Sequence, residues 1–584
     1  MKLAKTICCF LSLITVCHPK TYSQPFLNEE RARLIKLYLS RVGSFDYSGQ
    51  VLIAENNNIA LDEAYGYANR EEKIKATDET IFELASCSKM FTAIAILHLE
   101  MEGKLSVNDN LEKFFSHCPA DKAGITIHQL LTHTSGIPGG DLVDDFAAIS
   151  KEKLCEKIFA TPLSANPGAS FIYSNAGYNL LAAIIEKQSG KDYGAYLKQN
   201  IFIPLGMKHS FIAGDAALKE KKVAVAYNGI ANNGGPDFKF NPRTWGGGSV
   251  CSTAGDLWLL KNGLYDNTIF NETARKKMMT KYVMVGRKGD NFYGYGCFVY
   301  QSPDDKSRVV DFIGENERGP NCTFRIFPDL DQTFISLSNC RHVGETLNSW
   351  NRWFLDPHLK NLWKGDKHFA IPPQVNEVVT RSLSKYAGTY QNGNSIIHLS
   401  VQGNNLAAEG EGVEASSLLY GMSTNMIEKT GKVEQAVSHF INSYINTNSE
   451  GFKMVMSAEQ LKGFEEERDG LVKKYGQFKS YTIKGIFPDR DTSFLKCAIE
   501  LEFEKGKVPF FTLWNMQVPA KPMIDFSSPG DKTTIAKIFA PLDKNTFIGY
   551  NFFTDAIDGT LNFKWKDGKV DSIIGGNNRI FKHK

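Results

Sequence analysis

The sequence predicts an α+β protein with more than one domain. Residues 47–54 form an apolar run typical of a buried strand, and residues 178–187 carry the wide apolar face of a mostly buried helix. Near the end of the chain, Leu561, Phe563 and Trp565 alternate with polar residues, as in a strand with one buried face. A chain of 584 residues is too long for one ordinary domain, so these mixed elements are expected to form several units.

The composition is that of a folded globular protein without a strong net charge. Hydrophobic residues make up 42% and charged residues 22%, and 67 basic against 64 acidic residues give a net charge of +3. A nucleic-acid binder would carry a basic face or cluster, and the chain has no lysine or arginine block of that kind. The 12 histidines form no H-E-x-x-H or other clustered ligand set, so we expect neither a metal nor a cofactor.

The first 23 residues have the pattern of a secretory signal peptide. Lys2 and Lys5 supply a positive start, residues 6–16 an apolar core, and residues 21–23 a small-residue exit. The core is about half of the ~20 residues that a spanning helix needs, which favours cleavage over a membrane anchor. We therefore expect an exported protein, periplasmic or secreted, without a transmembrane span once the signal is removed. Three of the 11 cysteines lie in this segment, and the scattered others are expected to be buried thiols.

The expected first domain, residues 24–360, begins with strands, continues through helices and ends with another pair of strands. One helix is expected to start at Ser86. The segment Thr126–Gln129 has the spacing of a capping box that opens a further helix. Strands are expected at 322–327 and 333–337, where β-branched and aromatic residues flank a turn.

The rest of the chain is expected to be β-rich. Residues 361–374, which include two consecutive prolines, form the best linker candidate. Residues 375–584 begin and end with hairpin signals, while helical and half-buried-strand patterns lie between them at about 425–520. We expect a small β-barrel interrupted by an inserted α+β module, and no chemistry in either.

Ser86 and Lys89 are the first candidates for chemistry. They stand three residues apart ahead of an apolar run, so on a helix they share one face, about 5–6 Å apart at Cβ. A serine hydroxyl is a weak nucleophile until a base takes its proton, and an ammonium at a helix N-terminus favours the developing negative charge. The same spacing recurs at Ser150 and Ser382 without a site around it, so spacing alone favours an ordinary helix start.

Tyr173 and Asn175 are the next candidates. Because the chain has no G-x-S-x-G elbow, the base for Ser86 is expected to be a lysine or a tyrosine. Tyr173 lies in a loop before a helix, where its phenol can point into a cleft. Asn175, two positions on, projects to the same side if this piece is extended, and its amide can hold both Lys89 and a substrate carbonyl.

The region from about residue 47 to 355 resembles the serine β-lactamase and penicillin-binding-protein-like family, closest to its class C β-lactamase and D-peptidase/esterase branch. The resemblance covers somewhat over half of the chain and does not extend to the C-terminal region. It rests on six segments in the family's order: Gly66–Asn69, Leu84–Ala93, Leu130–Gly136, Tyr173–Tyr178, Ile201–Met207 and Ser252–Asp256.

The resemblance implies a β-lactamase/transpeptidase-like domain, in which an antiparallel sheet flanked by helices faces a helical lobe across the active cleft. It implies Ser86 as the nucleophile, Lys89 and Tyr173 as its base system, and Asn175 as a group that orients the substrate. The backbone N–H of Ser86 and one from an edge strand would form the oxyanion hole, where each donor is typically worth about 10²–10³ in rate.

One element departs from the family pattern. The family carries Lys-Thr-Gly or His-x-Gly on the strand that lines the cleft, and the corresponding place, counted back from Gly319, is Ile313-Gly-Glu315. Glu315, Asn316 and Arg318 are therefore the expected substrate-contacting residues of this loop. Arg318 is its one cation, and the negative charge of Glu315 would repel a carboxylate-bearing substrate. Efficient β-lactam hydrolysis is therefore not expected.

Two functions remain open at this point. The first is an exported serine hydrolase that acts on an ester or amide of a small molecule or peptide through a Ser86 acyl-enzyme. It is favoured by the retention of all four of the serine, lysine, tyrosine and asparagine residues, in order. The second is a catalytically weak or inactive relative that binds a peptide, a cell-wall fragment or a partner protein through the same cleft. The departure at Ile313 and Glu315 favours this second function.

Overall fold

The computed structural model describes residues 29–584, apart from residues 46, 140–148, 229–230, 235–241, 287–288, 290, 303–305, 317, 342–370, 377, 446–457, 489–493, 516–521, 526–534, 552–555 and 576–578. The predicted signal peptide and most of the predicted linker lie outside the described residues.

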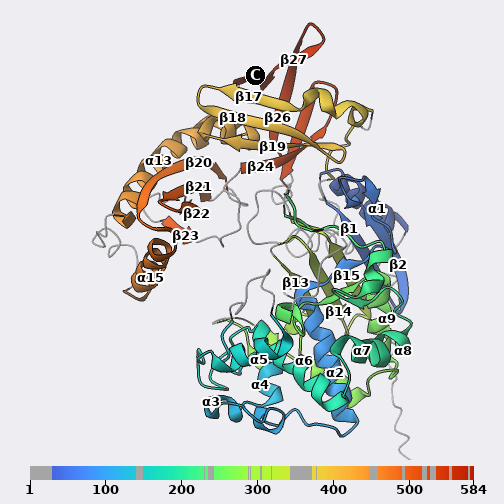
Figure 1. The fold of residues 1–584 in the computed structure, drawn as a ribbon. Helices are drawn as coiled ribbons and strands as arrows, with labels where there is room; N and C mark the ends of the chain where they lie inside the picture. Colours follow the sequence, from blue (N-terminus) through green and yellow to red (C-terminus); the bar gives the residue numbers. More distant parts are fainter. Residues whose placement is uncertain are drawn as a thin grey trace, which may run out of the picture.

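An antiparallel sheet of eight strands forms the framework of the first domain (Figure 1), in the order β10-β11-β12-β13-β14-β15-β1-β2. Strand β1 (Gly49–Glu55) has an apolar middle, Val51–Ala54, because helices cover both of its faces: Val51 and Ile53 pack with helix α1, and Leu52 and Ala54 belong to the core that contains helix α2 (Lys89–Met101). The predicted strands are thereby confirmed. The remaining bounds are β2 Asn58–Tyr65, β10 Val283–Met284, β11 Phe292–Tyr293, β12 Phe298–Gln301, β13 Arg308–Glu315, β14 Asn321–Phe327, β15 Gln332–Ser338 and α1 Glu29–Gly43.

A group of helices packs on the α2 face of this sheet and forms the largest hydrophobic core. Helix α4 begins with the predicted capping box, in which Thr126 Oγ1 accepts from Gln129 N and Gln129 Oε1 accepts from Thr126 N. Helix α6 is buried from Ala176 to Ile185, as its wide apolar face predicts. The bounds are α2 Lys89–Met101, α3 Ala120–Ala123, α4 Ile127–Leu131, α5 Lys151–Ala160, α6 Asn175–Ser189, α7 Tyr193–Leu197, α8 Ile203–Leu205, α9 Ala254–Tyr265 and α10 Glu272–Met278.

Short strands and turns connect these layers and carry residues of the site. A three-stranded sheet pairs β5 and β6 with the central β9, and a second one joins β7, β8 and β16. The bounds are β3 Tyr67–Asn69, β4 Ile74–Lys75, β5 Phe82–Glu83, β6 Phe211–Ile212, β7 Tyr227–Asn228, β8 Ala231–Asn232, β9 Val250–Ser252 and β16 Cys340–Arg341.

The C-terminal region is a closed eight-stranded barrel, β17-β18-β19-β24-β25-β26-β27-β28. Inward-facing side chains such as Leu399, Phe539 and Phe563 fill it, and helix α12 contributes Leu418 and Leu419 to the same core. The bounds are β17 Gly388–Asn392, β18 Ser395–Gln402, β19 Asn405–Glu411, α12 Val413–Leu419, β24 Ile535–Pro541, β25 Thr546–Asn551, β26 Ala556–Lys566, β27 Lys569–Ile574 and β28 Ile580–His583.

The chain leaves the barrel between β19 and β24 to form a separate α+β module, so the predicted insertion is confirmed. Two long helices cover one face of a four-stranded sheet in the order β20-β21-β22-β23. The predicted half-buried strand is β21, whose Leu495, Cys497 and Ile499 face the helices. The bounds are α13 Thr424–Ile445, α15 Ala458–Tyr475, β20 Phe478–Pro488, β21 Phe494–Phe503, β22 Gly506–Asn515 and β23 Pro522–Asp525.

Helix α1 joins the barrel to the first domain (Figure 1). Its apolar residues form one hydrophobic cluster with Ala540, Ile548 and Tyr550 of the barrel, and Asn405 Nδ2 donates to the Ser44 carbonyl at 2.9 Å. Because α1 covers the sheet face opposite to α2, the barrel is attached on the side away from Ser86 at the start of α2. Barrel residues outside the barrel core therefore pack on the back of the sheet and not on the wall of the site.

Two predictions about cysteines and membrane segments can be compared with the described residues. The eight described cysteines are all free thiols; six are buried and two half-buried, in agreement with the expected thiol packing. None of the described helices combines the length and apolar character needed to cross a bilayer.

Candidate active site

Ser86 lies in a sharp turn rather than on the predicted helix. Residues Ala85–Ser88 form a 3₁₀ turn, and the α-helix begins only at Lys89. Ala85 has a φ of +46°, a conformation that a residue with a Cβ adopts at an energetic cost. The turn leaves Ser86 half-buried while its neighbours from Leu84 to Met90 are buried. The hydroxyl of Ser86 is thus presented at the surface of an otherwise closed core.

Lys89 is buried, with 1% of its surface exposed, and its Nζ lies within hydrogen-bond distance of three oxygens. They are Ser86 Oγ at 3.0 Å, Asn175 Oδ1 at 2.8 Å and the Gly247 carbonyl at 2.9 Å. The amide and carbonyl oxygens can only accept, so two N–H bonds of the lysine are directed at them. The remaining substituent position of Nζ points at Ser86 Oγ. A lysine ammonium would donate a hydrogen bond there, and a neutral amine would accept the hydroxyl proton.

Tyr173 and Asn175 reach the same place from the start of helix α6. Ser174 is the N-cap of that helix: its Oγ accepts from Gly177 N at 3.2 Å and donates to the Pro138 carbonyl at 2.9 Å. Since Ser174 is turned into the cap, the residues on either side of it face Lys89. The ring centroid of Tyr173 lies 4.8 Å from Lys89 Nζ. The structure therefore brings Ser86, Lys89, Tyr173 and Asn175 together.

The segment 245–247 supplies a contact that the sequence analysis missed. Gly246–Gly248 looks like a flexible run in the sequence, yet the Gly246 carbonyl accepts from Thr92 Oγ1 at 2.6 Å and the Gly247 carbonyl accepts from Lys89. A Cβ at Gly246 would lie 2.1 Å from the Tyr178 carbonyl, so only glycine fits. The sequence feature that could have indicated this contact is the run of three consecutive glycines, Gly246–Gly248.

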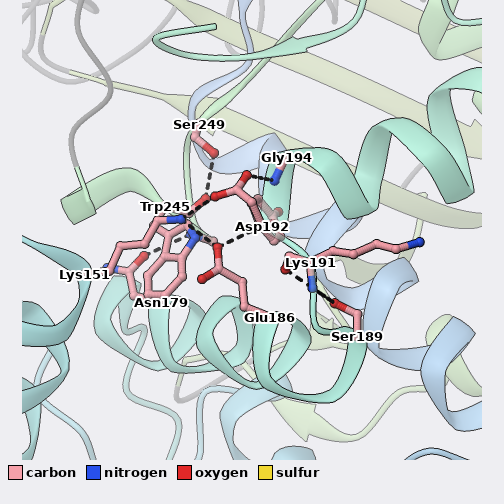
Figure 2. A network of polar contacts seen from close by, with 11 residues as sticks. Lys151, Asn179, Glu186, Ser189, Lys191, Asp192, Gly194, Trp245 and Ser249 are labelled. Atoms are coloured by element: carbon pink, nitrogen blue, oxygen red, sulfur yellow. Dashed lines mark hydrogen bonds and ion pairs between the residues drawn. The ribbon is translucent and has the colours of Figure 1, made fainter.

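A polar network behind this segment fixes its position (Figure 2). Lys151 Nζ lies 4.7 Å from the Trp245 ring centroid and forms ion pairs with Glu186 at 2.6 Å and Asp192 at 2.7 Å. On the other side, Gly246 N donates to Asn179 Oδ1 at 3.1 Å. Held from both sides, the segment presents the Gly247 carbonyl to Lys89 in one orientation.

The strand that lines the site, β13, approaches the nucleophile through Gly314. A Cβ at this position would lie 2.0 Å from the Leu84 carbonyl and 3.0 Å from Ser86 N. Counting back from Gly319 in the sequence placed the final glycine of the family's third element at position 315. The structure corrects this position to 314, because Gly314 is the residue that lies against the backbone of Ser86. Phe312, two residues earlier on the same face, is fully buried and stacks on Phe324. The motif position that carries a cation in the family therefore carries a core phenylalanine here.

The loop after β13 is tied to the strand that precedes the nucleophile. Asn316 Nδ2 donates to Glu83 Oε1 at 2.9 Å, and Arg318 Nη1 lies 3.8 Å from Glu83 Oε2. Burial raises the pKa of Glu83, and Arg318 and Asn316 act in the opposite direction. Asn316 and Arg318 thus hold the loop in place near Ser86. Glu315 is half-buried on the strand face opposite to Gly314. Substrate contact by these three residues stays a prediction.

The described residues contain no group of three or more histidine, cysteine, aspartate or glutamate side chains placed to hold a metal ion. The functional groups that converge at Lys89 are a hydroxyl, an amine, a phenol and an amide.

Fold and site together define a serine-based β-lactamase-type domain, and comparison with known proteins agrees. The family model described as Beta-lactamase matches residues 47–354, so the chain belongs to the β-lactamase family. This confirms the resemblance drawn from the sequence motifs.

Among similar proteins are two from Bacillus subtilis strain 168. Penicillin-binding protein 4* is 29% identical over 393 residues, which cover 62% of this chain and 83% of the relative. The putative penicillin-binding protein PbpX is 32% identical over 273 residues, 46% of this chain and 66% of the relative. The octameric penicillin-binding protein homologue from Pyrococcus abyssi superposes with a TM-score of 0.50 at 21% identity, covering 88% of this chain and all of that one. This last likeness extends the shared fold beyond the first domain.

Proposed function

We propose that the protein is an exported serine hydrolase that cleaves an ester or amide through an acyl-enzyme on Ser86. The observation that carries the proposal is the position of Lys89 Nζ, which lies 3.0 Å from Ser86 Oγ while two acceptor-only oxygens engage its other N–H bonds. A neutral amine held this way directs its lone pair at the serine hydroxyl. Export is supported by the signal-peptide pattern of the first 23 residues.

In the first half-reaction, Lys89 takes the proton of Ser86 as Oγ attacks the substrate carbonyl carbon. Asn175 accepts from the lysine through Oδ1, and this bond orients its amide beside Ser86. Tyr173, whose ring lies beside Lys89, is suited to pass the proton to the leaving alcohol or amine. The bond to the leaving group breaks as this proton arrives, which leaves the acyl group on Ser86.

The negative charge of the tetrahedral intermediate would be stabilised by two backbone N–H groups. Gly314 lets strand β13 approach within contact distance of the Ser86 backbone, so the N–H of Ser86 and that of Glu315 are the candidate donors. In the second half-reaction, water attacks the acyl carbonyl carbon, and its proton passes to Tyr173 and Lys89. The ester bond to Ser86 Oγ then breaks, Lys89 returns a proton to Oγ, and the free acid leaves.

Efficient β-lactam hydrolysis is not part of the proposal. A β-lactam carries a carboxylate next to its reactive ring, and the family binds that group with a cation on the strand lining the cleft. Here that strand carries Phe312 and Ile313, and the nearest loop cation, Arg318, is engaged by Glu83 and by the Asn233 carbonyl. The preferred substrate is therefore an ester or amide without a carboxylate at that position.

The same feature supports a second candidate function. A relative without the strand cation, and with its loop residues bonded to Glu83, could retain the cleft as a binding site for a peptide, a cell-wall fragment or a partner protein without turning substrate over. The two candidates differ in whether Ser86 becomes acylated.

The test is covalent labelling of the purified full-length protein. We expect a fluorophosphonate probe to add its mass to Ser86, and the Ser86→Ala variant to lose the label. Ser150→Ala is the matched control, because Ser150 has the same S-x-x-K spacing but caps helix α5 through its bond to Lys153 N. We also expect hydrolysis of p-nitrophenyl esters without hydrolysis of a chromogenic cephalosporin. A folded wild-type protein that stays inert to the phosphonate, the esters and labelled penicillin would favour the binding module.

A further inference from the structure

We infer that His133 is a positioning residue that holds Tyr173 in register with Lys89 and Ser86. The inference rests on the proposed role of Tyr173 in proton transfer. His133 is inferred to act through Tyr173, because its ring lies against Phe171, Tyr173, Tyr178 and Tyr293.

His133 binds both neighbours of Tyr173 in the chain. Ile172 N donates to the His133 carbonyl at 2.8 Å, and Ser174 N donates to His133 Nδ1 at 3.0 Å. Between these two bonds, the imidazole lies against the phenol ring itself, with centroids 4.3 Å apart and planes inclined by 35°. One residue thus fixes the backbone before Tyr173, the backbone after it and one face of its ring.

The hydrogen bonds assign a single tautomer to this histidine. A backbone N–H can only donate, so Nδ1 must be the accepting nitrogen and the ring proton must be on Nε2. Nε2 then donates to Tyr293 Oη at 3.2 Å. Tyr293 hydrogen-bonds Tyr178, whose hydroxyl donates to the Leu131 carbonyl at 2.9 Å. The imidazole is therefore locked at both nitrogens and cannot rotate without breaking a chain of buried bonds.

The backbone of His133 adopts a conformation that costs energy. Its φ is +59°, in the left-handed region, and the residue is 1% exposed. A residue with a Cβ adopts that conformation at a cost of about 1 kcal/mol or more, which glycine would avoid. Strain of this kind persists where the surrounding structure requires the side chain, and here the requirement is the contact with residues 172–174.

The test compares three variants at position 133 with a matched control in ester hydrolysis. His133→Ala removes the Nδ1 acceptor and the stacked ring, and we expect kcat to fall about 10²-fold with KM within threefold, because a misplaced proton donor impairs the reacting geometry. His133→Asn keeps an acceptor for Ser174 N, and we expect it to recover at least tenfold over alanine. His133→Phe keeps only the stacked ring and should stay close to alanine.

The matched control is His128→Ala. His128 is a half-buried histidine on the preceding helix, and its ring contacts are with Tyr282 and Tyr295, whose Oη lies 2.8 Å from His128 Nδ1. We expect kcat within threefold of wild type. Equal losses of kcat in the two alanine variants, or rescue absent in His133→Asn, would mean that His133 acts only through general stability and would overturn the inference.

A structural readout keeps this test independent of turnover. With 3-fluorotyrosine placed at position 173, we expect one sharp ¹⁹F resonance in the wild-type and His133→Asn proteins, and a shifted or split resonance in His133→Ala. An unchanged resonance in His133→Ala would overturn the inference even if the wild-type enzyme is active. If the wild type proves inert, the proposed function fails, while the ¹⁹F result still decides whether His133 positions Tyr173.

Discussion

Two buried lysines, one in each large region of the molecule, have opposite kinds of partner. In the first domain, Lys89 is 1% exposed, and its three partners are a hydroxyl, an amide oxygen and a backbone carbonyl. In the barrel, Lys537 is 3% exposed, forms an ion pair with Asp558 and lies 4.5 Å from the centroid of the Tyr420 ring. Lys89 thus has neutral partners, whereas Lys537 has a carboxylate.

In the proposed mechanism, this difference separates a reactive lysine from a structural one. Burial lowers the pKa of Lys537, and its carboxylate partner, Asp558, acts in the opposite direction by stabilising the ammonium. The partners of Lys89 are neutral oxygens instead, and one of them belongs to the serine whose proton it is proposed to remove. In the proposed mechanism, similar burial therefore supports chemistry at Lys89 and packing at Lys537.

The comparison is tested most strongly by replacing each lysine with methionine. We expect Lys89→Met to slow phosphonate labelling of Ser86 by about 10²–10⁴-fold, the range that loss of a general base produces, while the variant stays folded. Methionine fills the space without a titratable group, so packing is largely kept. Labelling rates come from intact-mass spectrometry over time, and a variant that labels within fivefold of wild type would remove Lys89 from the mechanism.

Two glycines, Gly314 beside Ser86 and Gly549 beside Lys537, allow the same comparison to be tested with backbone substitutions. A Cβ at Gly314 would meet backbone atoms, the Leu84 carbonyl at 2.0 Å and Cys87 N at 2.6 Å, and these cannot move without displacing the turn of Ser86. A Cβ at Gly549 would meet the flexible end of Lys537, Cε at 2.5 Å. We expect Gly314→Ala to reduce labelling by about 10²-fold, as when one oxyanion donor is lost, and Gly549→Ala to leave it unchanged.

Circular dichroism and a thermal melt accompany both glycine variants. A folded Gly314→Ala protein that labels at the wild-type rate would show that strand β13 does not help form the site.

The four candidate side chains that the structure brings together could be predicted from the sequence because they form two pairs, each within a few residues of the chain. Ser86 and Lys89 are joined by one helical turn, and Tyr173 and Asn175 by one N-cap, so spacing alone constrains their directions. Alternating patterns located the strands of both regions in the same way, and the helix expected at Ser86 was displaced by only three residues. Its start moved because the left-handed Ala85 makes a 3₁₀ turn first.

The remaining features depend on contacts between distant segments. The Gly247 carbonyl, the His133 ring and the close approach of Gly314 are set by packing across the fold, and no short pattern encodes such distances. The third element was counted one residue too far because a loop of unknown length separates Gly314 from Gly319. Closure of the barrel likewise requires β17 to pair with β28, which are almost two hundred residues apart in sequence.

Lys537→Met is the counterpart in the barrel. We expect it to lower the free energy of unfolding by about 1–3 kcal/mol, because Asp558 loses its partner while it remains mostly buried, and to leave Ser86 labelling within twofold. Chemical denaturation followed by circular dichroism measures the first quantity. The double variant Lys537→Met/Asp558→Asn is the control, and it should recover part of the loss. A labelling defect in either protein would contradict the structural role of this lysine.

The smallest expected effect is a pH dependence that originates beside Lys89. Burial lowers the pKa of His133 well below its usual value of about 6.5, and a positive charge on Lys89 would act in the same direction. The other titratable groups that face the imidazole are Tyr173, Tyr178 and Tyr293, and burial raises the pKa of the last two. As the pH falls below about 6.5, the unfolded chain binds a proton at this histidine and the folded protein does not, so stability decreases.

The His133→Asn variant lacks the titratable imidazole at position 133 but keeps every other titratable group of the wild type. We therefore expect the difference in melting temperature between the wild type and His133→Asn to be largest near pH 7.5 and to narrow towards pH 5.5, as measured by calorimetry in matched buffers. No barrel group contributes to this difference, since Lys537 and Asp558 are common to both proteins. A difference that stays constant over the range would mean that His133 is protonated in the folded protein, and the bond from Ser174 N to Nδ1 would then have to be abandoned.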